Sequence, residues 1–156
     1  MFTLGSSAYK DQSAMDARFT CEGASVSPPL KWSGAPAGTK SYALIIDDPD
    51  APDPAKPQRT FVHWVIYDIP AGVTSLKEGA SQDLPDGARA GANDKGEADY
   101  TGPCPPIGRH RYFHKLYALD VVLPDLHNPS KAQLLAAMKG HVVGQTQLIG
   151  TYQKHS

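Results

Sequence analysis

The chain has 156 residues, enough for one compact domain that buries roughly 70% of the surface of its unfolded form. Its 15 Lys and Arg residues nearly balance 16 Asp and Glu residues, so the formal charge is -1. This balance excludes a general electrostatic attraction to nucleic acid or to an anionic membrane. We therefore predict a single domain over residues 1–156, no nucleic-acid partner, and anion binding only where a local site provides it.

The N-terminal residues "MFTLGSSAYKDQ" lack the cationic and apolar regions of a secretory signal, and no later apolar run has the length of a membrane span. We expect a cytoplasmic protein with no integral membrane association. Cys21 and Cys104 are too few for a disulfide framework and lack C-x-x-C spacing, so we expect two reduced thiols.

Four segments have the composition of β-strands. Residues 41–48 and 60–69 are short, rich in β-branched and aromatic residues, and followed by proline-bearing turns. Their near-continuous apolarity indicates strands that are buried on both faces. Residues 111–123 and 147–153 have a similar composition, so we predict a mainly β fold.

One helix and one long loop complete the predicted elements. Ser130 can cap a helix within residues 131–143, and Gly140 weakens its last turn. The apolar residues at helical spacing are Leu134, Leu135, Met138 and Val142. Residues 77–101 are rich in glycine and lack periodicity, which predicts a long surface loop near the site.

Carboxylates and one imidazole are associated with the first two strands. Asp47, Asp48 and Asp50 come directly off the first strand, where prolines stiffen the chain; the alternative is that they are solvated turn residues. His63 is expected to share an apolar strand face with Phe61, Val65 and Tyr67. It is either a site residue or a core histidine with a hydrogen-bond partner.

The stretch "GPCPPIGRHRYFHKLYALD", residues 102–120, combines a stiff loop with polar residues at the start of a strand. His110 and Tyr112 are two residues apart and share one face, whereas Arg111 points to the other face and is expected to pair with a carboxylate or with carbonyls. Gly102 permits close backbone approach beside the prolines. If Asp48, His63, His110 and Tyr112 converge, they form a pocket suited to a phosphate monoester or a carboxylate.

Three blocks, "VSPPLKWSGAPAGTKSYALIIDDPDAPDP", "HWVIYDIP" and "GPCPPIGRHRYFHKLYALD", closely resemble the phosphatidylethanolamine-binding protein family, in particular its bacterial and archaeal Raf-kinase-inhibitor-like branch. The resemblance extends over residues 2–154. It implies a β-sandwich of antiparallel sheets with a few short helices, one of them near the C-terminus, and a small pocket for anionic head groups.

The resemblance also implies the site residues. The ligand-binding positions are Asp48, His63, Gly102, Pro103, His110 and Tyr112, with Asp50, Pro52 and Cys104 in a second tier and a cis peptide bond before Pro52. The sequence departs from the family pattern at Ser25, where Asn is common, and at Lys95, where Trp is common. Lys95 either adds affinity for an anion or is solvated.

We predict a non-enzymatic module, without cofactor or metal, that binds phosphate, a phosphorylated head group or a carboxylate. The resemblance implies modulation of a protein partner such as a kinase or protease, and a homodimer. One alternative is a hydrolase with Cys104 as nucleophile and His110 or His63 as base, although Pro105 removes the N–H after the thiol. Another is a metal site formed by Asp48, His63, His110 and His114, which no compact ligand motif supports.

Overall fold

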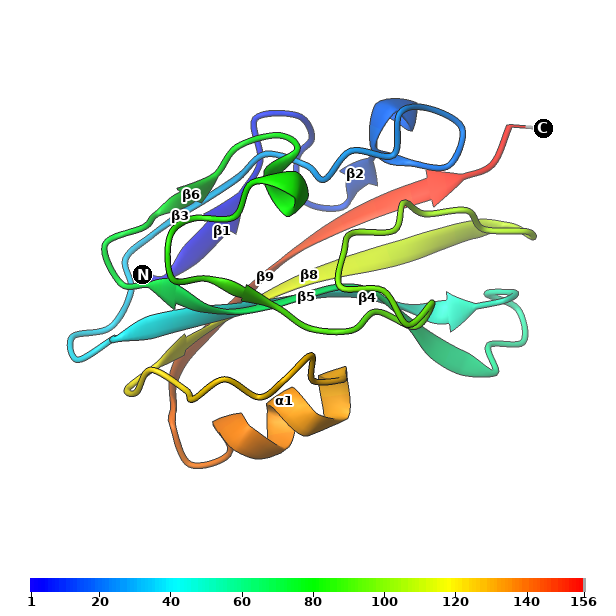
Figure 1. Cartoon of the computed structure of the whole chain (residues 1–156). Coiled ribbons are helices and arrows are strands. Elements are labelled where there is room, and N and C mark those ends of the chain that lie inside the picture. The colour runs from blue at the N-terminus through cyan, green and yellow to red at the C-terminus, as the bar shows by residue number, and fades with distance from the viewer. Residues whose placement is uncertain (156) are drawn as a thin grey trace.

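The computed structural model describes residues 1–155, which form two β-sheets and one α-helix (Figure 1). The larger sheet contains, in spatial order, β2 (Ser13–Ala14), β9 (Val142–Gln153), β8 (Arg109–Leu119), β4 (Ser41–Ala51), β5 (Arg59–Pro70) and β7 (Arg89–Ala90). The smaller sheet contains β1 (Thr3–Gly5), β3 (Leu30–Ser33) and β6 (Ser75–Leu76). The helices are α1 (Lys131–Met138) and two short 3-10 turns, η1 (Ala17–Phe19) and η2 (Ala80–Gln82).

The larger sheet is covered on both faces. The smaller sheet lies over one face, and α1 lies over the other (Figure 1). One apolar cluster fills the space between the sheets and includes Leu4, Trp32, Ile46 and Trp64. A second cluster packs α1 onto the sheet through residues such as Leu134. This arrangement explains why β4 and β5 are almost continuously apolar, and it confirms the mainly β sandwich.

The register of the three long strands positions the candidate site. β4 pairs with β8 from Ser41 opposite Leu119 to Asp47 opposite Phe113, and its other edge pairs with β5. The C-terminal end of β4 therefore lies beside the N-terminal ends of β5 and β8. The polar residues that we predicted as site residues come from three separate segments, and all of them lie at this end of the sheet.

Two details of the sheets differ from the expected pattern. β2 pairs with β9 in parallel, so the larger sheet is not wholly antiparallel. The segment over residues 77–101 is not only a loop, because it contains η2 and the edge strand β7, which pairs with β5.

The helix begins as expected and ends earlier. Ser130 accepts a hydrogen bond from the Gln133 N–H (3.2 Å), and the Gln133 side chain accepts one from the Ser130 N–H (3.0 Å), which forms a capping box. α1 ends at Met138 because Gly140 adopts a left-handed conformation (φ +84°), and Val142 starts β9 instead of extending the helix. Within residues 1–155, no helix has the length and apolarity needed to cross a membrane.

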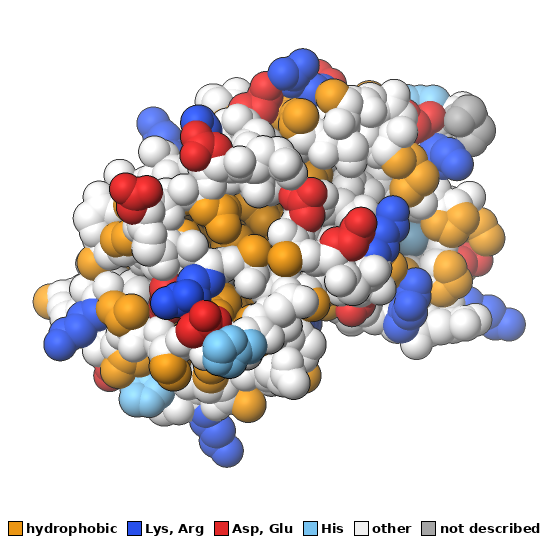
Figure 2. All heavy atoms as spheres, viewed as in Figure 1, with side chains coloured by type: hydrophobic (Ala, Val, Ile, Leu, Met, Phe, Trp, Pro, Cys, Tyr) orange, Lys and Arg blue, Asp and Glu red, His pale blue; other side chains and the backbone are white. Residues whose placement is uncertain are grey.

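The surface in view shows acidic and basic side chains interspersed rather than gathered into a patch of one sign (Figure 2). This distribution fits the nearly neutral formal charge. Local geometry, rather than overall charge, therefore has to define any anion site.

Candidate functional site

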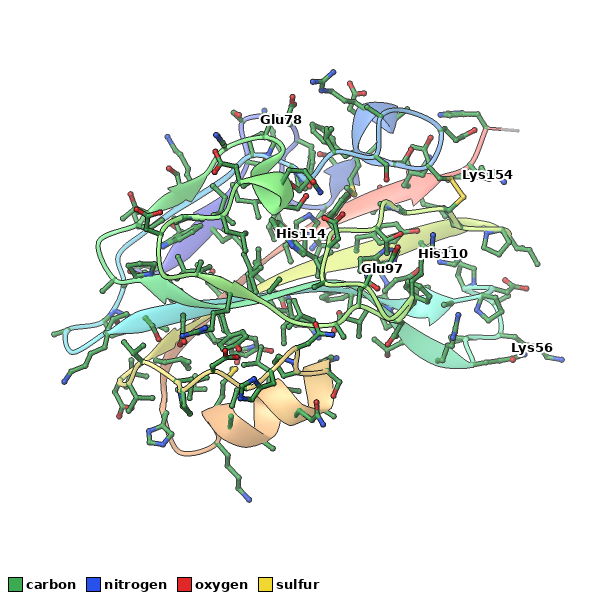
Figure 3. All side chains as sticks on the ribbon, viewed as in Figure 1. Lys56, Glu78, Glu97, His110, His114 and Lys154 are labelled. Atoms are coloured by element: carbon green, nitrogen blue, oxygen red, sulfur yellow. A yellow bond between two sulfur atoms is a disulfide. The ribbon has the colours of Figure 1, made fainter. Side chains whose placement is uncertain are left out.

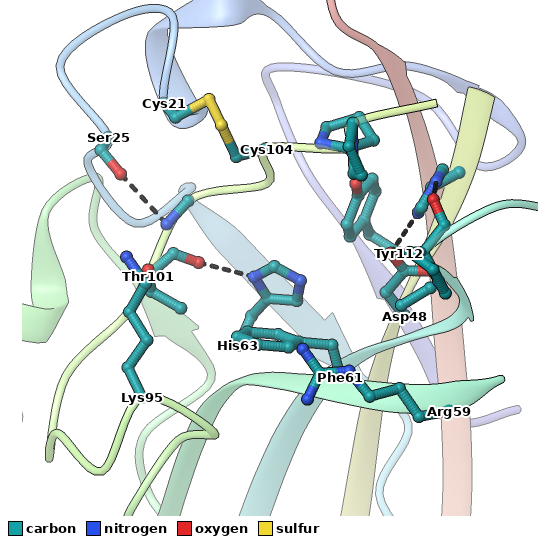
Figure 4. Close-up of a pocket in the computed structure, with 16 residues that line it drawn as sticks. Cys21, Ser25, Asp48, Arg59, Phe61, His63, Lys95, Thr101, Cys104 and Tyr112 are labelled. Atoms are coloured by element: carbon teal, nitrogen blue, oxygen red, sulfur yellow. Dashed lines mark hydrogen bonds and ion pairs between the residues drawn. A yellow bond between two sulfur atoms is a disulfide. The ribbon is translucent and has the colours of Figure 1, made fainter. Parts of the chain in front are cut away.

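A cavity of about 350 Å³ opens at the end of the larger sheet where β4, β5 and β8 meet (Figure 4). Segments far apart in the sequence complete its wall. The residues that line it are Cys21, Ser25, Asp48, Ala51, Pro52, Arg59, Phe61, His63, Lys95, Thr101, Gly102, Cys104, Pro105, Pro106, His110 and Tyr112. The structure thus brings Asp48, His63, His110 and Tyr112 to one cavity, as the sequence argument required.

Asp48 and His110 form a buried pair in which both ring nitrogens are engaged. The His110 Nδ1 lies 2.5 Å from Asp48 Oδ2, and Nε2 lies 2.9 Å from the Ile107 carbonyl and 3.1 Å from the Pro52 carbonyl. Because carbonyl oxygens only accept hydrogen bonds, Nε2 carries a proton and donates hydrogen bonds to both of them. The Asp50 N–H donates to the other Asp48 oxygen (2.7 Å). Burial nevertheless raises the pKa of Asp48, against the opposing effect of the His110 hydrogen bond.

His63 faces the cavity together with Arg59 and Phe61, and a β-bulge in β5 separates it from the side chains that follow. Ile46 pairs with Trp64, whereas the next residue, Asp47, pairs with Val62, so His63 is an extra residue in the ladder. Its ring contacts Phe61 and the cavity residue Tyr112 (centroids 4.8 and 5.2 Å). The expectation that His63 also shares a face with Val65 and Tyr67 is wrong: those two side chains pack under α1.

The hydrogen bonding of His63 leaves one ring nitrogen available. Its Nδ1–H donates to the Thr101 carbonyl (2.8 Å), and no described residue bonds to Nε2. Burial lowers the pKa of His63 to about 4, so the ring is neutral at neutral pH. Nε2 then presents a lone pair, and it becomes a donor only when it takes up a proton.

Tyr112 lies between the two histidines, with its ring stacked on His110 (centroids 6.3 Å) and edge-on to His63. Burial raises the pKa of the Tyr112 phenol, so the hydroxyl remains protonated. Within the described chain, no group hydrogen-bonds to that hydroxyl. It is therefore a neutral donor available to a ligand.

A disulfide joins Cys21 to Cys104 in the cavity wall, with Cα atoms 5.3 Å apart (Figure 4). The expectation of two reduced thiols is therefore wrong. Two cysteines 83 positions apart gave no sequence signal of pairing; the fold brings them together. Because Cys104 has no free thiol, the structure also contradicts a hydrolase that uses it as nucleophile.

The backbone on either side of this disulfide is closely packed. The Gly102 N–H donates to Ser25 Oγ (3.0 Å), and a Cβ at Gly102 would lie only 2.3 Å from that oxygen. Only glycine fits this approach. Pro103 does not line the cavity; its carbonyl accepts from the Cys21 N–H (3.0 Å) and so holds the two segments together.

The other carboxylates at the end of β4 are structural. Asp50 lies outside the cavity and accepts from the Arg111 backbone N–H (2.9 Å), Nε (3.0 Å) and Nη2 (2.8 Å), which confirms the expected pairing of Arg111. Asp47 binds Lys115 (3.2 Å) and Lys131 (2.6 Å). Both carboxylates, like Asp48, are almost fully buried, so they are not solvated turn residues. The Ala51–Pro52 peptide bond is cis, as the family resemblance implied.

His114 is a packed core residue. Its Nδ1 lies 2.8 Å from the Tyr112 carbonyl, and its Nε2 lies 2.7 Å from the Tyr9 hydroxyl. Figure 3 shows it further along β8 than His110. Within residues 1–155, no group of three or more His, Cys, Asp or Glu side chains is arranged to hold a metal ion.

Sequence reasoning missed several cavity residues, of which Arg59 and Phe61 carried a detectable signal. Arg59, Phe61 and His63 alternate at the start of β5, and this period of two places them on one face. The Arg59 guanidinium lies over the Phe61 ring (4.9 Å to the centroid). Cys21 and Thr101 carried no comparable signal, because irregular segments deliver them to the wall.

Comparisons with known proteins identify the family of this chain. Residues 5–153 match the family described as phosphatidylethanolamine-binding protein. A UPF0098 protein of Methanothermobacter thermautotrophicus is 48% identical over 97% of this chain and 98% of its own length.

Two solved structures share the fold along their whole length. A phosphatidylethanolamine-binding protein homologue of Chlamydia trachomatis has a TM-score of 0.89 and 39% identity, with 98% of this chain and 97% of that chain covered. YbcL of E. coli, described as a member of the mammalian family, has a TM-score of 0.89 and 33% identity, with 98% of both chains covered. The chain belongs to the phosphatidylethanolamine-binding protein family.

Proposed function

We propose that the cavity binds a small anion: phosphate, a phosphorylated head group or a carboxylate. The main support is the set of polar groups that the fold leaves unused there. The Tyr112 hydroxyl and His63 Nε2 have no partner among the described residues, and Arg59 and Lys95 line the same cavity without a carboxylate partner. The only carboxylate in the lining, Asp48, is already occupied by His110.

Size and rigidity favour a small ligand. A cavity of about 350 Å³ lies at the lower end of the range for small-molecule sites and is too small for a macromolecule. The disulfide, the prolines and the Asp48–His110 pair hold the wall before a ligand arrives. A preordered wall reduces the entropy that is lost on binding.

Isothermal titration calorimetry with inorganic phosphate tests the proposal. Tyr112→Phe removes one donor and little volume, and it should weaken binding about tenfold or more, because a hydrogen bond to a charged group contributes about 1.5–3 kcal/mol. Tyr117→Phe is the matched control, since Tyr117 packs under α1 away from the cavity. No heat with the parent protein, or equal affinities for all three proteins, would reject the site.

We also propose that the chain modulates a protein partner such as a kinase or protease, which is the role that the family resemblance implies. Anion occupancy would then regulate this interaction. Activity assays of purified kinases and proteases, with and without the chain and with phosphate present in both arms, test this role. Unchanged activities throughout the panel would reject it for those enzymes.

A further inference from the structure

Two cations at the cavity have no part in the fold's ion pairs. Lys95 and Arg59 both line the cavity, and Figure 4 shows them on two sides of His63. Within residues 1–155 neither side chain contacts a carboxylate, and Glu97, in the same turn as Lys95, does not pair with it. Most other cations near this end of the sheet differ: Arg111, Lys115 and Lys131 all bind carboxylates.

The backbone that carries Lys95 is held firmly. Asn93 is buried, and its side-chain oxygen accepts from the N–H groups of Lys95 (2.9 Å) and Glu97 (3.0 Å). Asp94 attaches this turn to β5 twice: its N–H donates to the Val62 carbonyl (2.9 Å), and its carboxylate accepts from the Val62 N–H (2.8 Å). Because Val62 adjoins His63, the turn holds the Lys95 backbone at the same end of β5 as the cavity.

Arg59 is placed from the opposite direction. It is the first residue of β5, and its guanidinium rests on the face of Phe61, whose ring contacts His63. A cation over an aromatic face is stabilised in one orientation while its N–H groups remain free for a ligand. The guanidinium and the Lys95 ammonium thus present positive charge at two points around His63.

We propose that these two cations select ligands that carry a second negative charge beyond the group bound at Tyr112 and His63. This inference rests on the proposed anion binding. The ligand class that it specifies is a phosphomonoester with an additional anionic group. The second group of the ligand lies between Lys95 and Arg59. A zwitterionic ethanolamine phosphate, whose outer group is an ammonium ion, is disfavoured at the same place.

The cavity lining formed by the described residues has no free carboxylate, so the site should prefer an anionic outer group to a cationic one. Recognition of an ammonium group requires an available carboxylate, carbonyl or aromatic face. Asp48 is engaged by His110 and by the Asp50 N–H, and the Phe61 face is covered by Arg59. A cationic outer group would therefore meet the two like charges without a free carboxylate to offset them.

Three phosphate esters of similar size differ in the charge of their outer group, so they test its effect apart from that of the phosphate. They are phosphoglycolate (carboxylate), ethyl phosphate (uncharged) and phosphoethanolamine (ammonium). Calorimetry at low salt should rank their affinities in that order. Each exposed ion pair strengthens binding by up to about fivefold, so phosphoglycolate should bind about tenfold more tightly than phosphoethanolamine. Higher salt should reduce this ratio, because both cations are exposed.

Substitutions test whether Lys95 and Arg59 cause the preference for an anionic outer group. Lys95→Gln and Arg59→Gln should each reduce the phosphoglycolate to phosphoethanolamine ratio about threefold to fivefold. Lys40→Gln is the matched control: it removes the same charge at the other end of the sheet, where the Lys40 N–H donates to the Leu119 carbonyl. Circular dichroism of each variant establishes that it is folded.

The outcomes distinguish this proposal from the one on which it rests. If inorganic phosphate and all three esters fail to bind, the anion site itself is wrong. If phosphate binds but the esters bind equally, or phosphoethanolamine binds most tightly, the anion site stands and the selectivity is refuted. A ratio that Lys95→Gln and Arg59→Gln leave unchanged also refutes it.

Discussion

Breaking the Cys21–Cys104 disulfide should destabilise the fold strongly and disturb the cavity only slightly. The bond links residues 83 positions apart. In the loop-entropy model, a constraint of this length on the unfolded chain corresponds to about 4.5 kcal/mol of folding free energy. Domains of this size have total stabilities of about 5–15 kcal/mol, so the loss is a large fraction.

The cavity should tolerate the loss because hydrogen bonds join the same two segments. The Cys21 N–H donates to Pro103 (3.0 Å), the Gly102 N–H to Ser25 (3.0 Å), and the Tyr100 hydroxyl to the Phe19 carbonyl (2.7 Å). These bonds persist while the protein remains folded. Phosphate affinity of the folded, reduced protein should therefore fall by only about threefold, equivalent to one weakened neutral hydrogen bond.

Urea unfolding measures the effect directly. Both cysteines are exposed, so a small dithiol can reach the bond, become oxidised to a cyclic disulfide and leave two cysteine thiols. With a urea dependence of about 2 kcal/mol per molar, the unfolding midpoint should fall by about 2 M. The double variant Cys21→Ser/Cys104→Ser should behave like the reduced protein, and Cys104→Ser alone should lose as much stability. Equal midpoints for oxidised and reduced protein, or two titratable thiols in the untreated native protein, would refute the reasoning.

Two further predictions concern buried ionisable groups. Burial holds the pKa of His63 and His114 at about 4, below the value of 6.5 for an exposed histidine, so unfolding takes up protons and stability falls as the pH decreases from about 6.5 towards 4. Each ring contributes up to about 1.4 kcal/mol per pH unit, and His63→Gln should reduce the slope of urea-unfolding free energy against pH by about half; an unchanged slope contradicts this. Asp50→Asn replaces the carboxylate that binds Arg111, and because Arg111 is half exposed we expect a loss of about 1–2 kcal/mol in urea unfolding. The control is Asp53→Asn, at a half-buried turn position whose carboxylate accepts from the Ala55 N–H; equal loss in both variants contradicts a specific role.

The parts of the fold that follow from local patterns could be predicted. The apolar runs of β4 and β5 indicated burial on both faces, and the alternation of His110, Arg111 and Tyr112 separated a cavity face from a face that pairs with Asp50. The ends of the helix show the limit. Ser130 provides a local capping signal, whereas Gly140 weakens a helix without specifying that a strand follows at once.

The parts of the site that were missed depend on tertiary geometry. The bulge at His63 adds one residue to β5 relative to β4, and a register shift of this kind leaves no mark in the sequence of one strand. The disulfide depends on the close approach that Gly102 makes to Ser25. Lys95 was noted as a departure from the family, but its exposure at the cavity depends on the contacts of Asn93 and Asp94.

Most polar atoms at this end of the sheet already form hydrogen bonds within the fold. The remaining atoms determine which ligand groups the site can bind. His110 was predicted as a ligand donor, yet both its nitrogens face acceptors, so it shapes the wall while Tyr112 and His63 remain available. A neutral His63 offers a lone pair, so an anion beside it must either contribute a proton or cause the ring to take one up. A phosphate monoester can do both near neutral pH, since its second pKa is about 6. If the cavity binds anions as proposed, one permanent donor, one exchangeable proton and two outer cations favour phosphomonoesters over anions that hold no proton.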